Sequence, residues 1–320
     1  MTRVLVTGAT GFVGRQLCEN LAAAGYLVRA ALRTDRALPA WIAEKTVTGD
    51  ISGATRWGPA LENVDLVIHA AARTHVLYDS PANSRLYVET NSDATQALAA
   101  ESARSGVRRF VYLSSVKVNG EGRGGRPYTA GDEPQPQDAY GSSKWLAEQR
   151  LWQIVARTSL PAAVVRAPLV YGVGVGANFL RLLRWIDRER LLPLGAVRNQ
   201  RSLVSVWTLC DLLSRLLVHP AAVNGTWMVS DGEDLSTPEL VRRIAHLMGR
   251  RARLLSVPPS LLRVAGALAG KGAEMLRLCA SLTVDIAATR ERLGWGPPLS
   301  AEEALARTVS WYRSTGGEPR

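Results

Sequence analysis

The sequence predicts an α/β protein whose first part is a doubly wound parallel sheet covered by helices and whose second part is a smaller α/β region. Strand and helix patterns alternate over residues 1–170, a glycine-rich turn joins the first strand to the first helix, and the alternation breaks down after residue 170. A chain of 320 residues is long enough for two domains. We place them at residues 1–170 and 171–320.

The first strand is predicted at Val4–Thr7, a short apolar and β-branched run. A helix over Phe12–Gly25 follows, with its apolar residues on one side and glycine at its end. Further strands are predicted at Leu27–Leu32, Lys45–Thr48, Asp65–His69, Arg109–Ser114 and Ala162–Ala167, and helices at Ser84–Ser105 and Ala139–Thr158. Right-handed crossovers between such units place ligands at the carboxyl ends of the strands.

The second part has a different pattern. Helices are predicted at Asn178–Arg190, Thr208–His219 and Thr237–Gly249, with short strands near Ser202–Val206 and Thr226–Val229. We expect a substrate-binding cap from which some strands and helices return to the first sheet. Residues 120–138 are rich in glycine and proline, and a loop of this length inside a compact domain is typical of a functional lid.

Composition excludes several classes of protein. Net charge is +11 and arginines are spread along the chain, without a block of like charge or interleaved aromatics, so we expect no nucleic-acid partner. No apolar run reaches the length of a membrane span. The three separated cysteines indicate a reduced, cytoplasmic protein, and the four histidines lack metal-ligand spacing, so we expect no metal site.

The turn after the first strand reads Thr7-Gly-Ala-Thr-Gly-Phe-Val-Gly14. Gly8 permits a tight turn, Gly11 lets the backbone approach a pyrophosphate, and Gly14 lets the helix pack closely on the strand. The amino terminus of the helix then presents amide donors to the phosphates. Because this triad follows a strand and opens a helix, it predicts a Rossmann-type dinucleotide site.

The end of the second predicted strand bears on the choice of cofactor. An acidic residue there contacts the ribose of NAD, but here Leu32 is followed by Arg33. Arg33 is suited to a 2′-phosphate, which favours NADP slightly over NAD; in the alternative, Asp35 reaches the ribose. Asp50 and Ile51, after the third strand, are placed to contact adenine.

Tyr140 and Lys144 lie four residues apart in a predicted helix, which puts both side chains on one face. A nearby ammonium and the positive charge of an oxidised nicotinamide would stabilise a tyrosinate and lower the pKa of the phenol. Ser115 follows a strand and therefore lies at the carboxyl edge of the sheet. We predict that Ser115, Tyr140 and Lys144 form a catalytic group that exchanges a proton with a substrate oxygen.

With these motifs the chain resembles the extended short-chain dehydrogenases/reductases of the NAD-dependent epimerase/dehydratase family, whose members mostly process nucleotide-activated sugars. The matching segments are Thr7–Gly14, His69–Ala72, Thr90–Thr95 with Asn91, Ser114–Ser115, Tyr140–Lys144, Arg166–Gly172, Arg201–Val206 and Leu293–Pro297. The resemblance implies that Phe12, Val13, Ala70, Ala71, Asn91 and Pro168 line the cofactor and that Asn178 and Arg201 face the sugar and diphosphate. It also implies a homodimer formed through the helices at Ser84–Ser105 and Ala139–Thr158.

The residues after Ser115 bear on the reaction. Dehydratases of this family carry Asp-Glu there, whereas this chain has Val116 and Lys117, which argues against dehydration. The segment Ser114–Glu121 resembles a UDP-glucose 4-epimerase-like branch that includes reductases of 4-keto UDP-2-acetamido-2,6-dideoxyhexoses, which form UDP-N-acetylquinovosamine for polysaccharides. We expect Lys117 to contact the substrate or the lid, the alternative being a solvated lysine.

Three functions remain open on the sequence. Reduction of a UDP-4-keto-hexose is slightly favoured over 4-epimerisation of a UDP-sugar. A non-catalytic NAD(P)-binding sensor is disfavoured, because such proteins commonly lose the tyrosine or the lysine, and both are present here.

Overall fold

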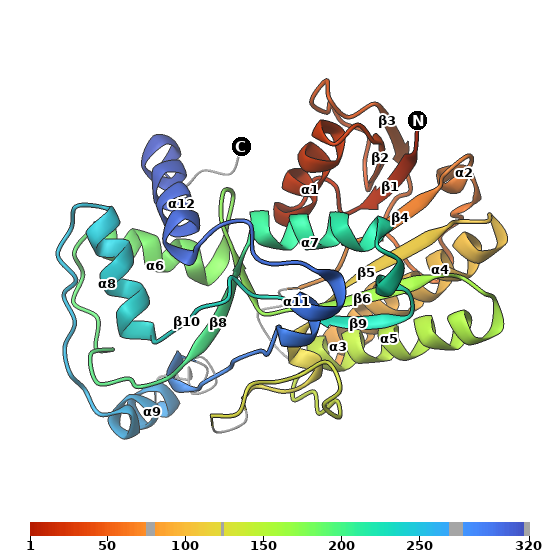
Figure 1. Cartoon of the computed structure of the whole chain (residues 1–320). Helices are drawn as coiled ribbons and strands as arrows, with labels where there is room; N and C mark the ends of the chain where they lie inside the picture. Colours follow the sequence, from red (N-terminus) through yellow and green to blue (C-terminus); the bar gives the residue numbers. More distant parts are fainter. Residues whose placement is uncertain (75–80, 123–124, 269–277, 317–320) are drawn as a thin grey trace.

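A computed structural model describes residues 1–74, 81–122, 125–268 and 278–316 (Figure 1). Its larger sheet has the strand order β3-β2-β1-β4-β5-β6-β9, and each neighbouring pair is parallel. The strands are β1 (Arg3–Thr7), β2 (Leu27–Leu32), β3 (Glu44–Val47), β4 (Leu66–His69), β5 (Arg109–Ser115), β6 (Ala162–Ala167) and β9 (Gly225–Met228). The doubly wound fold predicted from the alternating pattern is confirmed.

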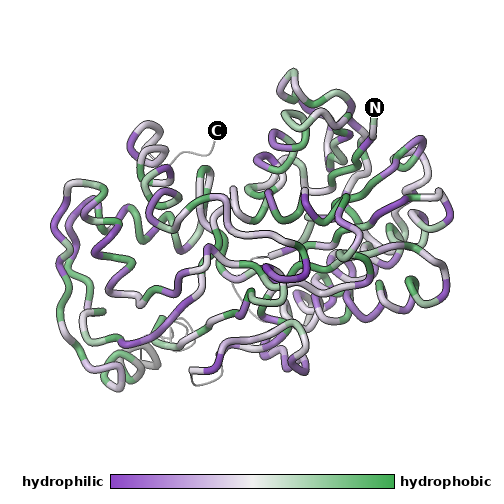
Figure 2. The backbone as a smooth tube through the Cα atoms, in the orientation of Figure 1, coloured by the Kyte–Doolittle hydropathy of each residue, from purple (hydrophilic) through white to green (hydrophobic). Residues whose placement is uncertain are grey.

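Each face of this sheet packs against its own helices. Val4 and Val6 of β1 face α1 (Phe12–Ala23) and α7 (Val206–Val218), whereas Leu5 faces the opposite layer, because successive strand side chains point to opposite faces. That opposite layer contains α2 (Gly58–Leu61), α4 (Ala94–Arg104) and α5 (Ala139–Arg157). Hydrophobic and hydrophilic residues alternate along α5 in Figure 2, as expected of a helix that covers a sheet with one face.

The second part of the chain builds a smaller layered unit. A three-stranded sheet has the order β10-β8-β7 and consists of β7 (Leu169–Tyr171), β8 (Arg201–Ser205) and β10 (Asp234–Leu235). It packs with α6 (Ala177–Asp187), α8 (Thr237–Leu247) and α12 (Ala301–Thr315) around a second apolar core. Further helical segments are η3 (Pro220–Ala222), α9 (Pro259–Leu268) and α11 (Ala287–Leu293).

The chain crosses between the two layered units more than once. Strand β9 pairs with β6 in the larger sheet, and α7 packs against α1, although both follow residue 171. The domain boundary at residue 170 therefore remains a proposal about where the substrate-binding part begins. It does not mark a division of the hydrophobic core.

The long helix predicted at Ser84–Ser105 is interrupted. The structure has α3 (Pro81–Tyr87), a π-helical stretch η1 (Val88–Asp93) and then α4. A π-helix accommodates an extra residue in its turn, so the side chains on either side of it are rotated relative to one another. Asn91 and Ser92, both buried, lie in this stretch.

Membrane-spanning helices and metal clusters are both absent from the described ranges. There, no helix is long and apolar enough to cross a membrane. No group of three or more His, Cys, Asp or Glu side chains in those ranges could hold a metal ion. His75 and residues 123–124 of the predicted lid lie outside those ranges.

Candidate active site

The glycine turn between β1 and α1 is too tight for side chains. Gly8 has φ of +71°, and a Cβ there would lie 2.8 Å from the amide nitrogen of Ala71. A Cβ on Gly14 would lie 2.0 Å from the Gly8 carbonyl oxygen, so strand and helix approach each other as the sequence predicted. The Gly11 amide donates to that same oxygen at 2.9 Å, which closes the turn.

The amino terminus of α1 is open to an anion. Its N-cap residue is Gly11, which has no side chain to accept from the first amides of the helix. A helix amino terminus with available amides binds phosphate through those amides and the helix dipole. Phe12 and Val13 are partly exposed in this first turn, and Ala70 and Ala71 are partly exposed after β4. This cradle fits a dinucleotide.

The predicted adenosine residues follow β2 and β3. Arg33 and Asp50 form an ion pair at 3.8 Å, and their side chains are 76% and 90% exposed. Asp35 instead accepts from Lys45 at 2.6 Å, and this hydrogen bond holds the pKa of its carboxyl below the usual range. Ile51 is half-buried beside them. The contact between Arg33 and Asp50 places both predicted adenosine residues at one exposed site.

Strand β5 and helix α5 bring Ser115 and Tyr140 together. Ser115 ends the strand, Tyr140 lies in the first turn of the helix, and the Ser115 hydroxyl lies close enough to the phenol to favour its charged form. Burial raises the pKa of the Tyr140 phenol above its usual range, the Ser115 hydroxyl opposes the rise, and Asp138 and Tyr87 add to it. The ring of Tyr87 meets that of Tyr140 edge-on, with centroids 6.1 Å apart.

Lys144 lies one turn further along α5 and is fully buried. Its ammonium donates to the carbonyl oxygen of Leu113 at 2.7 Å and lies 4.3 Å from the ring centre of Tyr112. Burial lowers its pKa to about 7, and Glu148 partly opposes this effect. The ammonium therefore contacts β5, and the lowering of the phenol pKa by Lys144 stays a prediction.

A buried charged network behind this group was missed on the sequence. Glu148 accepts from Ser114 Oγ at 2.5 Å and forms a bidentate pair with Arg166, whose closest contact is 2.7 Å. Arg166 also donates to Asn119 at 3.2 Å. The available signal was a glutamate on the buried face of α5, four residues after Lys144, combined with an arginine inside an otherwise apolar strand.

The side chain of Asn91 links two separate segments of the chain. Its amide nitrogen donates to the Arg73 carbonyl at 3.0 Å and to Ser143 Oγ at 2.9 Å, and its oxygen accepts from the Arg73 amide at 2.8 Å. The side chain therefore ties the segment after β4 to the catalytic helix α5. The interrupted helix makes this possible, because Asn91 lies in its π-helical turn.

His69 forms a polar link from the sheet to α4. Its ring nitrogens contact the hydroxyls of Thr7 and Thr95 at 2.6 and 2.9 Å. Burial lowers its pKa to about 3, so the ring is neutral at ordinary pH. The histidine joins the ends of β1 and β4 to the helix without a charge.

The predicted substrate residues lie on separate elements. Asn178 is exposed in the first turn of α6 and accepts from Arg181 at 2.9 Å. Arg201 begins β8, donates to the Ala280 carbonyl at 3.3 Å, and has a pKa lowered by burial, an effect that Glu121 opposes. Pro168 is buried between β6 and β7. The ammonium of Lys117 contacts the carboxylates of Asp138 and Glu121.

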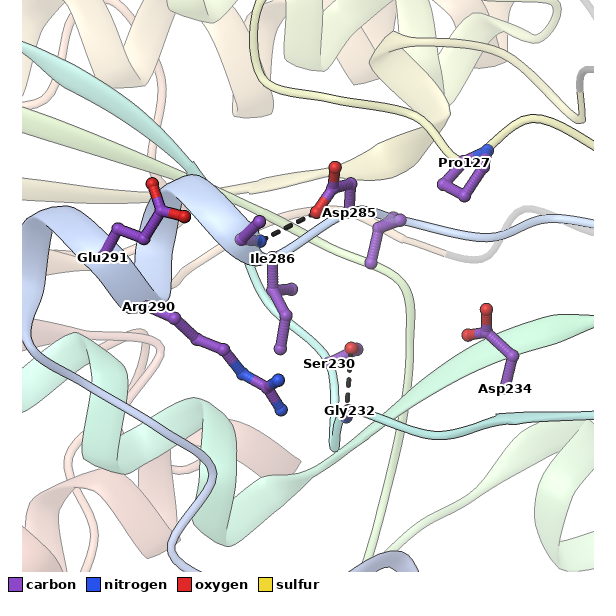
Figure 3. Close-up of a pocket in the computed structure, with 10 residues that line it drawn as sticks. Pro127, Ser230, Gly232, Asp234, Asp285, Ile286, Arg290 and Glu291 are labelled. Carbon is purple, nitrogen blue, oxygen red and sulfur yellow. Dashed lines mark hydrogen bonds between the residues drawn. The ribbon is translucent and has the colours of Figure 1, made fainter.

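A cavity of about 380 Å³ opens away from the catalytic side chains (Figure 3). Its lining comes from Ser230 in the loop after β9, from Asp234 at the start of β10, from Pro127, and from Asp285 and Arg290 before and within α11. None of Ser115, Tyr140 or Lys144 lines it. The candidate site therefore rests on the geometry at the carboxyl ends of β1 and β5, not on this hollow.

The comparison with protein families decides the assignment. Residues 4–229 match the model of the NAD dependent epimerase/dehydratase family. The chain belongs to this family. The match contains the glycine turn, Ser115, Tyr140 and Lys144. As a member, the chain is an NAD-dependent enzyme of the short-chain dehydrogenase/reductase type, as the sequence predicted.

Relatives of this epimerase/dehydratase family member match over nearly all of its length. A UDP-glucose 4-epimerase of Vibrio cholerae is 40% identical over 97% of this chain and 95% of its own. The solved structure of MoeE5 in complex with UDP-glucose and NAD is 26% identical with a TM-score of 0.78, covering 98% of this chain and 99% of that one. A UDP-glucose 4-epimerase from Thermotoga maritima, solved with UDP-glucose, shares the fold at 22% identity, a TM-score of 0.79 and the same coverage.

Proposed function

We propose that this enzyme exchanges hydride and proton at C4 of a UDP-hexose, with Ser115, Tyr140 and Lys144 as its catalytic residues. The observation that carries the proposal is the closeness of the Ser115 hydroxyl to the Tyr140 phenol at the carboxyl end of β5, which favours the charged form of the phenol. Two hydroxyls that face one another in this way can hold one substrate oxygen between them. The UDP-sugar is supported by the names and ligands of the relatives.

The chain's own residues divide the work as follows. Gly8, Gly11 and Gly14, with the amides of the first α1 turn, would hold the pyrophosphate of the dinucleotide, and the bound nicotinamide supplies or accepts the hydride. Tyr140 gives its phenolic proton to a C4 oxygen or removes the proton from a C4 hydroxyl. Ser115 orients that oxygen, and Lys144, when charged, stabilises the tyrosinate.

Arg201 and Asn178 are proposed to bind the diphosphate and the sugar. A guanidinium forms two parallel hydrogen bonds to phosphate oxygens, and burial strengthens such a contact. Arg201 is largely buried at the start of β8, whereas Asn178 lies in the first turn of α6 with its side chain exposed. The substrate would therefore extend from the catalytic tyrosine towards the smaller sheet.

Two net reactions share this chemistry. The resemblance of Ser114–Glu121 favours reduction of a UDP-4-keto-hexose for polysaccharide precursors, and the 40% identical relative favours 4-epimerisation. In a reductase one reduced cofactor is consumed for each product, whereas in an epimerase the hydride returns to the sugar and none is consumed. Cofactor stoichiometry therefore separates the two.

The test uses the purified chain with UDP-glucose or UDP-galactose, and separately with a UDP-4-keto-hexose and NADH or NADPH. Interconversion without net cofactor consumption supports the epimerase, and one reduced cofactor per reduced sugar supports the reductase. Tyr140→Phe should lower the rate of whichever reaction the parent catalyses by at least about a hundredfold, because the proton carrier is lost. The control, Tyr26→Phe, should react at the rate of the parent. Failure of the parent to act on any of these sugars would refute the proposal.

A further inference from the structure

Lys117 lies partly buried between the two ends of the 120–138 loop. It belongs to the short 3₁₀ turn η2 (Val116–Val118) directly after β5, and its side chain is 27% exposed. The ammonium lies 2.9 Å from a carboxylate oxygen of Glu121 and also contacts the carboxylate of Asp138. One cation therefore joins a residue at the start of the loop to the residue that closes it.

Asp138 is also the N-cap of the catalytic helix. Its second carboxylate oxygen accepts from the Gly141 amide at 2.7 Å, which satisfies a free donor of the first turn of α5. The main chain of η2 lies against the same turn, since a Cβ on Gly141 would be 2.7 Å from the Lys117 carbonyl oxygen. Tyr140 lies between the capping aspartate and the capped amide.

We propose that Lys117 is a positioning residue of the reaction: by binding Asp138 it fastens the first turn of α5, and with it Tyr140, to the strand end that carries Ser115. This inference rests on the proposed function only in assigning Tyr140 the proton transfer. The position of the phenol relative to the Ser115 hydroxyl is then set by an ion pair outside the catalytic group. Near catalytic atoms, a displacement of about 1 Å can cost about a hundredfold in rate.

The same contact governs the charge near the phenol. The polar and titratable groups that act on Tyr140 are Ser115 and Tyr112 from β5, Tyr87 from α3 and Asp138 at the helix cap, and Lys144 follows one turn along α5. The negative charge of Asp138 raises the pKa of Tyr140, and the ammonium of Lys117 compensates that charge. Without Lys117, the pKa of the phenol rises further, so the tyrosinate forms at higher pH.

Kinetics of Lys117→Met test the positioning. We expect kcat to fall about tenfold to a hundredfold, with KM for the UDP-sugar changed less than about twofold, and Lys117→Arg to recover most of the loss. The matched control is Arg243→Met, since Arg243 also bridges carboxylates, those of Glu233, Glu239 and Glu302, at a similar 25% exposure. A higher KM at unchanged kcat would overturn the proposal, because it would indicate a substrate contact.

The pH profile separates charge compensation from simple structural damage. In the direction that oxidises a sugar hydroxyl, Lys117→Met should move the rising limb of kcat against pH to higher pH. Asp138→Asn should move it to lower pH, since asparagine still caps the helix but carries no charge. The double variant should return towards the parent. If the rising limb of the pH profile lies at the same pH in all three variants as in the parent, Lys117 does not compensate the charge of Asp138.

Hydrogen exchange provides a measurement that needs no turnover. In Lys117→Met the amides of the first turn of α5, residues 139–142, should exchange faster than in the parent, and in Arg243→Met they should not. If the parent turns over no sugar nucleotide, the proposed function fails, and exchange alone decides the role of Lys117. Equal exchange in parent and Lys117→Met would overturn the positioning role even in an active enzyme.

Discussion

At the scale of single residues, the proposed catalytic group combines reactive side chains with burial. Lys144 is fully buried with a pKa of about 7, and the Tyr140 phenol has a pKa above its usual range. A folded state that disfavours a charged form loses stability by doing so, and the linkage fixes the sign of the pH dependence. For Lys144 this cost is present wherever the unfolded lysine is charged, and it can be tested, whereas a neutral Tyr140 phenol costs nothing below its usual pKa.

Replacing Lys144 should stabilise the fold while abolishing turnover. The unfolded lysine binds a proton below about pH 10.4, whereas the folded one releases it near pH 7. Between those values the unfolded state binds more protons, so the stability of the parent rises with pH; below pH 7 the full cost of burial remains. We expect Lys144→Met to raise the free energy of unfolding by about 2 kcal/mol at pH 6.

That advantage should disappear towards pH 10, as followed by denaturant unfolding at several pH values. Lys144→Arg is the control, because it keeps a buried charge and should gain nothing at pH 6. A difference between parent and Lys144→Met that does not change from pH 6 to 10 would contradict the lowered pKa.

Arg33 offers a test of whether a phosphorylated ribose is accepted. Its pair with Asp50 is exposed at 3.8 Å, and pairs of this kind contribute little, so the guanidinium is available to a 2′-phosphate. We propose NADP over NAD on this ground. Arg33→Ala should weaken NADPH binding about tenfold and leave NADH within about twofold, measured by calorimetry. Equal losses for both cofactors would instead indicate stacking of Arg33 beside the adenine.

At the scale of elements, the glycine turn can be tested for close packing. A Cβ on Gly14 would overlap the Gly8 carbonyl at 2.0 Å, and neither backbone segment can move without disturbing β1 or α1. We expect Gly14→Ala to cost about 3 kcal/mol or more in the free energy of unfolding. Gly296→Ala should stay within about 1 kcal/mol, because a Cβ there would meet no atom within 4 Å and the φ of Gly296 is not positive. Equal melting temperatures for the two variants would refute the packing argument.

Strong local patterns could be predicted to within a few residues. The strands Leu27–Leu32 and Ala162–Ala167 have the expected bounds, because apolar runs between turn signals define buried strands. Helix α12 was missed although Ser300 and Glu303 form a capping box, a signal readable in the sequence. Strand β10 has two residues, too few for any period to be recognised. Short elements depend on neighbours that the sequence pattern does not contain.

The same limit applies to the candidate site. Ser115, Tyr140 and the three glycines could be identified because each belongs to a fixed local spacing. The pairing of Glu148 with Arg166 joins α5 to β6, and that of Lys117 with Asp138 joins two loop ends. Such contacts are set by how elements pack against one another. The π-helical turn at Asn91 is likewise favoured by contacts to Arg73 and Ser143, not by its own residues.

At the scale of the whole molecule, the expected homodimer depends on the helices that cover one face of the larger sheet. Helices α4 and α5 lie side by side, and the buried residues Leu98 and Leu151 on them face the sheet. Gln96 on α4 and Gln149 and Gln153 on α5 face outward. Uncharged residues on two neighbouring helices suit a four-helix contact with a second copy, since charged residues are depleted at the centres of such interfaces.

We therefore expect sedimentation at twice the chain mass of 34.6 kDa. Gln96→Arg combined with Gln153→Arg should shift the protein towards the monomer, because four guanidinium groups would be buried at a twofold contact without partners. Glu19→Arg, on the exposed side of α1, is the control and should leave the mass unchanged. A monomeric parent would contradict the expectation outright. A dimer unaffected by the double variant would place the interface on another face.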